Sequence, residues 1–380
     1  MSKFGKVLGK KNVDLGSKTI HPGFTKNILW SSSGSMALNL LLTGNPRKGF
    51  CFSKSCIIGG ESGSGKSLVL ATAARQAQKE VNAFVVWLDA EKASEQKWFE
   101  RTGMDLSEDN FLRERVATIA DVAGIWSNII DVYDTEMKDF KAGKGDRPRP
   151  VFVVIDSFSV LMTDTQFGHA ESGEVVGDQG QQAKQLKDLM KKITHLCDNR
   201  EISVNGVVHT MQEQSSNPMK KVKTEIMLGG RGLMYLASMA FVFSKYSLTE
   251  ENLSDDDDVG AKKVIGIRAG AKLYKSRFSK PNERVDLSIP WDTGISPTAG
   301  VFAKLFAEGV IVMPTKGWYS LAPNQLDNTG KPVTFTGIPD KFRKADFEKF
   351  CENVLNTLYP ADELDIVEFD DKDRAEAEAA

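Results

Sequence analysis

The 380-residue chain is poor in cysteine and contains no CxxC spacing. Its four cysteines are sparse, which argues against a disulfide framework or a zinc site and favours a reducing compartment. Long hydrophobic runs are also missing, and the N-terminus has no apolar stretch of the signal-peptide kind. With 41% hydrophobic and 26% charged residues, we expect a globular cytoplasmic protein that has no membrane partner.

A strong net charge is missing as well, but the value of −2 hides an uneven distribution. Residues 362–380 carry nine acidic and two basic side chains, which leaves residues 1–361 with 47 basic and 42 acidic ones, a net charge of +5. Such a tail is typical of a solvated, disordered end. The alternative is a polyanion mimic that competes with nucleic acid for a basic surface.

Glycine is concentrated in the stretch "CIIGGESGSGKSLVL" at residues 56–70. It matches the phosphate-binding P-loop, G-x-x-x-x-G-K-[ST], between an apolar run and a helix-forming segment. Glycine permits the tight turn, and the first amides of the following helix have no internal partner and can bind anionic oxygens. The predicted phosphate-binding residues are Gly60, Glu61, Ser62, Gly63, Ser64, Gly65, Lys66 and Ser67.

Apolar runs alternate with segments of helical period over the first two thirds of the chain, which predicts an α/β fold with a mainly parallel central sheet. After residue 237, three strand-like runs without long helices between them predict antiparallel pairing at one edge. The expected parallel strands are 55–60, 83–90, 115–120, 151–157 and 202–210. The expected organisation is an N-terminal arm (1–30), an ATPase core (31–296), a small C-terminal α+β domain (297–361) and the acidic tail (362–380).

Two acidic positions follow apolar strands. Asp156 ends "VFVVID", where a carboxylate can hold Mg²⁺ opposite Ser67, although an isolated acid there is often only a helix cap. Glu91, in "WLDAEKA", is placed to orient and deprotonate the water that attacks the γ-phosphate. Asp89 lies in the same segment and competes for that role, and both acids are otherwise ordinary surface residues.

His209 ends the strand-like run "VNGVVH" and is placed to sense the γ-phosphate, although a lone histidine is more often structural. The segment that follows it, 211–228, is long, polar and lysine-bearing, with Lys220, Lys221 and Lys223. A second long segment, 162–180, follows the Asp156 strand. Loops of this length without structure are usually functional or disordered. They suggest a polymer ligand whose binding depends on ATP.

Taken in order, the motifs "GESGSGKS", "DAEKA", "VVIDS", "VVHTMQEQ" and "LGGRGLMYLAS" resemble those of RecA-type homologous recombinases. The resemblance is strongest to the UvsX recombinases of T4-like bacteriophages, which also carry His in the "VVH" position, and it runs from about Ser31 to Ser320. It implies an ATP- and Mg²⁺-dependent protein that polymerises on single-stranded DNA, pairs it with a homologous duplex, and releases it on hydrolysis.

The resemblance also implies roles for individual residues. Trp98 falls where the family stacks a Tyr on adenine, and the segments 162–180 and 211–228 resemble the two DNA-binding loops. The two basic residues that the family supplies from a neighbouring subunit correspond to Lys275 and Arg277. Further DNA contacts are implied for Lys184, Lys187, Gly229, Gly230 and Arg231.

Two other functions stay open at this point. A hexameric helicase of the same superfamily also places a Glu after the second strand, but it usually has an accessory N-terminal domain. A DNA-binding or mediator protein with a vestigial P-loop would not need the intact set of Lys66, Ser67, Glu91 and Asp156. A recombinase would further imply a single-strand binding protein and a recombination mediator as partners, in a bacterial host cytoplasm if the chain is phage-encoded.

Overall fold

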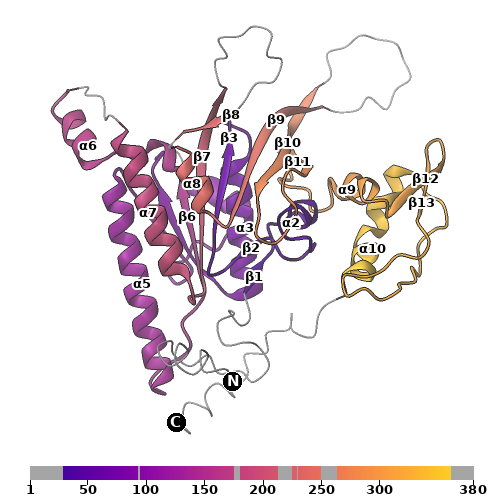
Figure 1. Cartoon of the computed structure of the whole chain (residues 1–380), viewed down its shortest axis with the longest axis horizontal. Helices are drawn as coiled ribbons and strands as arrows, with labels where there is room; N and C mark the ends of the chain where they lie inside the picture. Colours follow the sequence, from indigo (N-terminus) through magenta and orange to yellow (C-terminus); the bar gives the residue numbers. More distant parts are fainter. Residues whose placement is uncertain are drawn as a thin grey trace, which may run out of the picture.

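The computed structural model describes residues 29–92, 95–174, 180–212, 225–228, 230–249 and 263–360 (Figure 1). Its centre is a sheet in the order β11-β10-β9-β3-β7-β6-β4-β5, with β8 (Glu225–Met227) paired to β7. Five neighbouring strands run parallel, which confirms the predicted α/β class. They are β3 (Ser55–Gly60), β7 (Ile202–Gln212), β6 (Val151–Asp156), β4 (Phe84–Asp89) and β5 (Phe111–Arg115).

The three strands that follow residue 237 pair antiparallel with one another at one edge of the sheet, as predicted. Strand β9 (Met239–Thr249) runs parallel to β3, whereas β10 (Val264–Lys275) is antiparallel to both β9 and β11 (Arg284–Pro290). The chain therefore continues the sheet past the strand that carries the P-loop. This arrangement places β9 directly beside β3 up to Gly60, where the P-loop begins.

Helices cover both faces of the sheet (Figure 1). Side chains alternate along each strand, so Trp87 and Phe241 face one buried cluster, and Leu88 and Val242 face the other. Helices α2 (Met36–Thr43), α3 (Lys66–Val81) and α4 (Gln96–Thr102) contribute to the first cluster. Helices α5 (Ile119–Lys141), α7 (Gln181–Cys197) and α8 (Arg231–Leu236) contribute to the second.

The strand expected at 115–120 is wrong in its position. Strand β5 covers Phe111–Arg115, and α5 already begins at Ile119. The reason is a capping box, in which the Thr118 hydroxyl accepts from the Asp121 amide while the Asp121 carboxylate accepts from the Thr118 amide. The Thr118–Asp121 pair starts a helix within the stretch "RVATIA". Hydrophobicity alone assigns this stretch to a strand.

The segment 162–180 was expected to lack regular structure, and this is wrong for part of it. Helix α6 (Asp164–Glu171) begins at a second capping box between Thr163 and Gln166. None of its residues is buried, and it projects from the body of the molecule (Figure 1). A helix without a buried face has little tertiary packing to stabilise it.

The C-terminal part contains α9 (Val301–Ala307), the hairpin β12 (Ile311–Thr315) and β13 (Trp318–Leu321), the 3₁₀ helix η3 (Lys344–Phe350) and α10 (Cys351–Leu358). Its buried Lys304 forms ion pairs with Glu283 of the β10–β11 turn and with Glu308. The Arg47 guanidinium donates to the Tyr359 carbonyl at 2.7 Å. Two short strands, β1 (Trp30–Ser31) and β2 (Phe50–Cys51), and the 3₁₀ helix η2 (Phe158–Val160) complete the fold.

Within the described ranges, every helix is too short or too polar to span a lipid bilayer.

Candidate active site

The P-loop connects β3 to α3 at the carboxyl edge of the parallel strands. Gly65 adopts φ +94°, in the left-handed region, and a β-carbon there would lie 2.8 Å from Ile289 Cδ1. At Gly60 a β-carbon would lie 2.7 Å from Ser64 Oγ and 2.9 Å from the Phe243 carbonyl oxygen. Only glycine fits at either position, which explains why the loop sequence has this form.

Two groups of the P-loop are poised for an anion. The Lys66 ammonium is buried and donates to the Gly60 and Glu61 carbonyls at 2.9 and 2.7 Å. Burial lowers the pKa of Lys66, while the carboxylates of Glu91 and Asp156 oppose that shift. The Ser64 hydroxyl is fully buried and has no hydrogen-bond partner in the described part of the chain. An anionic oxygen in the loop would satisfy both groups.

Asp156 and Ser67 form the candidate metal site. Asp156 is 4% exposed, and its Oδ1 atom has no partner among the described residues. Burial raises the pKa of Asp156 to about 6, although the hydrogen bond from Ser67 acts to lower it. In the described ranges, His, Cys, Asp and Glu nowhere form a group of three or more that could hold a metal. One hydroxyl and one carboxylate suit Mg²⁺, which takes its remaining ligands from water and substrate phosphates.

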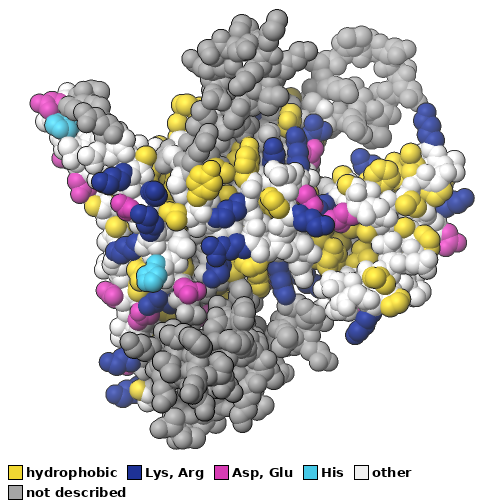
Figure 2. Space-filling model, viewed as in Figure 1, with side chains coloured by type: hydrophobic (Ala, Val, Ile, Leu, Met, Phe, Trp, Pro, Cys, Tyr) yellow, Lys and Arg dark blue, Asp and Glu magenta, His cyan; other side chains and the backbone are white. Residues whose placement is uncertain are grey.

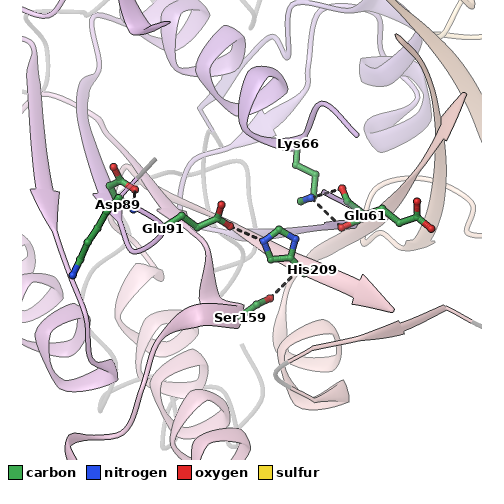
Figure 3. Close-up of polar contacts among 8 residues, drawn as sticks. Glu61, Lys66, Asp89, Glu91, Ser159 and His209 are labelled. Carbon is green, nitrogen blue, oxygen red and sulfur yellow. Dashed lines mark hydrogen bonds and ion pairs between the residues drawn. The ribbon is translucent and has the colours of Figure 1, made fainter. Parts of the chain in front are cut away.

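Glu91 and His209 pair beside this site (Figure 3). Glu91 Oε1 lies 2.6 Å from His209 Nε2, and both side chains are partly exposed. The hydrogen bond with His209 is the main reason that the pKa of Glu91 is lowered. The Ser159 hydroxyl fixes the end of β7 by accepting from the His209 amide at 2.7 Å, and the His209 carbonyl accepts from Leu228. Through His209, Glu91 is therefore linked both to the strand that leads into the segment 211–228 and to Leu228 at the end of that segment.

Asp89, the competing acid, is occupied elsewhere. It is 1% exposed, forms an ion pair with Arg113 of β5, and accepts from the Lys92 amide at 2.7 Å. Figure 3 shows it apart from the Glu91–His209 pair. A carboxylate that is buried and paired in this way is not available to deprotonate water. The geometry favours Glu91 for that role.

A cavity of about 300 Å³ opens from the P-loop side of α3. Trp98 lines it, and the same indole packs edge-on against Trp87 and Phe99. Ile267, Ile289 and Trp291 also line this cavity, and sequence analysis missed them. The aromatic and aliphatic walls next to a phosphate loop suit a nucleobase. No local motif identifies these three residues, because only the pairing of β10 and β11 brings them to the P-loop.

The chain is 27% identical over 175 residues to the recombination and repair protein of Enterobacteria phage T4, covering 46% of this chain and 41% of that protein. It is 25% identical over 373 residues to Protein RecA of Borreliella afzelii, covering 93% of this chain and 89% of that one. The chain is thus similar to RecA proteins over most of its length. No protein-family model matches it.

Protein RecA of Acholeplasma laidlawii is similar over 77% of the chain, at 25% identity. The resemblance to RecA-type recombinases that the motifs predict is therefore confirmed, and the central sheet with its flanking helices is a RecA-like α/β core. The relatives named here support a recombinase and give no support to a helicase. The match to the T4 protein spans less than half of its length.

Lys275 and Arg277 lie far from the P-loop of the same chain. Lys275 pairs with Ala240 at the start of β9, whereas Gly60 pairs with Phe243 further along that strand. The two cations are thus at the amino end of β3 and the phosphate loop is at its carboxyl end. The Lys275 ammonium donates to the Tyr235 carbonyl, and Arg277 is exposed.

The residues implied in DNA binding fall into two groups. Lys184 and Lys187 are exposed on α7, and Gly230 precedes α8 at φ +87°. The Lys187 stem packs on Gly232, where a β-carbon would lie 3.2 Å from its Cγ atom, so α7 and α8 form one surface. The side chain of Arg231 and the residues Lys220, Lys221, Lys223 and Gly229 lie outside what the structure describes.

Proposed function

We propose that this chain is an ATP-dependent recombinase that assembles on single-stranded DNA and exchanges strands with a homologous duplex. The observation that carries the proposal is the Glu91–His209 pair, 2.6 Å apart and adjacent to the Lys66 loop. It couples a water-activating carboxylate to the strand that leads into a candidate DNA segment. The recombination names of the relatives support the same function.

Each residue of the site has a distinct task in hydrolysis. Lys66 and the loop amides would bind the phosphate oxygens, and Ser67 and Asp156 would hold a Mg²⁺ ion, which would supply charge neutralisation at the phosphates. Glu91 orients the attacking water and takes its proton. A γ-phosphate oxygen competes with Glu91 for the His209 imidazole. When His209 turns to the phosphate, β7 transmits the change to the residues beyond Gln212.

DNA binding is assigned to the side of the molecule that carries α7, α8 and the ends of β7 and β8. Lys and Arg side chains are spread over the face drawn in Figure 2, with fewer Asp and Glu among them. Lys184 and Lys187 are exposed on α7. Contacts of this kind go to the DNA backbone, so affinity falls steeply with salt and shows little sequence preference.

Filament assembly would complete the ATP site, because Lys275 and Arg277 can reach only the nucleotide of a neighbouring copy. Residues 1–30 are assigned to the subunit contact, with Phe4 or Ile20 as the anchoring side chain. Their proposed receptor is a cavity of about 520 Å³ between the edge strand β5 and α5, lined by Leu112, Ile129 and Val132. An extended segment can add to an edge strand and place an apolar side chain in such a cavity.

The wider setting follows from this function. A strand-exchange protein acts on single strands, so a single-strand binding protein and a recombination mediator are proposed partners. The proposed location is the cytoplasm, that of the bacterial host if the chain is phage-encoded. The small C-terminal domain (297–361) and the acidic tail (362–380) are proposed as separate units that modulate DNA access.

The test combines three measurements on the full chain. ATP hydrolysis with and without single-stranded DNA, negative-stain imaging, and a strand-exchange assay with homologous duplex are expected to give stimulation, helical filaments and heteroduplex product. Closed rings that translocate and unwind DNA would indicate a helicase instead. DNA binding with no hydrolysis under any condition would indicate a mediator with a vestigial P-loop.

A further inference from the structure

Strand β9 passes directly behind the P-loop. Gly60 pairs with Phe243 in the parallel register of β3 and β9, and the Phe243 carbonyl approaches the position of a Gly60 β-carbon to 2.9 Å. Two residues further along β9 comes Lys245, and side chains two apart point to the same face of a strand. Lys245 therefore shares the face of Phe243, on which α3 and the P-loop pack.

The Lys245 ammonium lies against the outer side of the loop. A β-carbon built on Gly63 would be 3.0 Å from Lys245 Nζ, and Gly63 adopts φ +69°. Lys245 has neither an ion pair nor a hydrogen bond with any other residue that the structure describes. Lys66 reaches the same loop from inside, through the Gly60 and Glu61 carbonyls. Two ammonium groups from different elements thus flank one short stretch of backbone.

We propose that Lys245 is a second cation of the phosphate site, which stabilises the bound triphosphate in cis from the side of β9. The inference rests on the proposed ATP site at residues 60–67. A single positive charge within a few ångströms of the phosphates interacts more strongly as their number of charges increases. Lys245 therefore contributes to ATP affinity most, to ADP affinity less, and to AMP affinity hardly at all. It differs from Lys275 and Arg277, which would act only after assembly.

The experiment measures nucleotide binding by the full-length protein without DNA and at low protein concentration, so that the contribution of assembly is small. Lys245→Met removes the charge and keeps the length of the side chain. The matched control is Lys272→Met, an exposed lysine on the adjacent strand β10 that faces the opposite side of the sheet with Val242. Lys245→Arg restores the charge. Dissociation constants for MgATP, MgADP and AMP are determined by isothermal titration calorimetry.

Lys245→Met is expected to weaken MgATP binding about tenfold and MgADP binding about threefold, as expected for one partly screened charge. AMP affinity should stay within twofold, and Lys245→Arg should recover most of the loss. The proposal is overturned if Lys245→Met matches Lys272→Met, or if ATP, ADP and AMP weaken by the same factor. Failure of the wild-type chain to bind ATP would instead refute the proposed function.

Discussion

Replacing Asp156 with asparagine should stabilise the nucleotide-free protein at neutral pH while removing the metal site. Burial raises the folded pKa of Asp156 from 3.8 to about 6, which corresponds to a penalty of about 3 kcal/mol when the group is ionised in the fold. Because the folded pKa is the higher one, the folded state loses stability as the pH rises from about 4 to about 6, and the loss then levels off. Between pH 5 and pH 8, about 1.4 kcal/mol of this penalty develops.

The assay is the thermal midpoint of wild type and Asp156→Asn from pH 5 to pH 8, in EDTA and without nucleotide. The advantage of the variant should grow by about 2 °C over that range for a chain of this size. If the difference in thermal midpoint between the variant and wild type is the same at every pH, it reflects only how well the amide fits the site. That result would refute the burial argument for Asp156. MgATP should stabilise wild type and not the variant.

Three further predictions concern the ATP and DNA sites. Glu91→Gln should keep ATP binding and slow DNA-stimulated hydrolysis roughly 10²-fold or more, measured by phosphate release; near-normal turnover would refute the water-activating role of Glu91. Trp98→Ala should weaken ATP binding by about 1–2 kcal/mol in a titration, by loss of one aromatic wall, while Trp98→Phe should retain most of it. Deletion of residues 362–380 should raise DNA affinity at low salt by fluorescence anisotropy; equal affinity would remove the competition hypothesis.

The P-loop and the strand-terminal acids were predictable because their chemistry depends on local order. A glycine-rich turn between a buried strand and a helix puts Lys66 and Ser67 at one place whatever the rest of the chain does. The parallel sheet then brings the ends of β4, β6 and β7 to the same edge, so Glu91, Asp156 and His209 meet there. The fold class and this grouping therefore follow from the order of short apolar runs.

Other features depend on which strands become neighbours, and the sequence does not specify that. The sequence alone leaves the choice between Glu91 and Asp89 open, whereas the ion pair of Asp89 with Arg113 of β5 favours Glu91. Ile267 and Trp291 reach the cavity lined by Trp98 only through the antiparallel pairing of β10 with its neighbours. The strand expected at 115–120 is absent because the hydrogen-bonded cap of Thr118 and Asp121 starts a helix there. Hydrophobic periodicity gives no information about such a cap.

Strand β9 runs between the two groups of cations proposed to act on ATP. Its residue Ala240 pairs with Lys275 at one end of the sheet, and its residue Lys245 approaches the phosphate loop at the other. Because these ends point in opposite directions, Lys275 and the loop of one chain cannot meet on a single nucleotide. In the proposed filament, copies stacked head to tail would bring the Lys275 end of one chain onto the P-loop of the next. Hydrolysis per chain should therefore rise with protein concentration even without DNA, whereas binding through Lys245 should not.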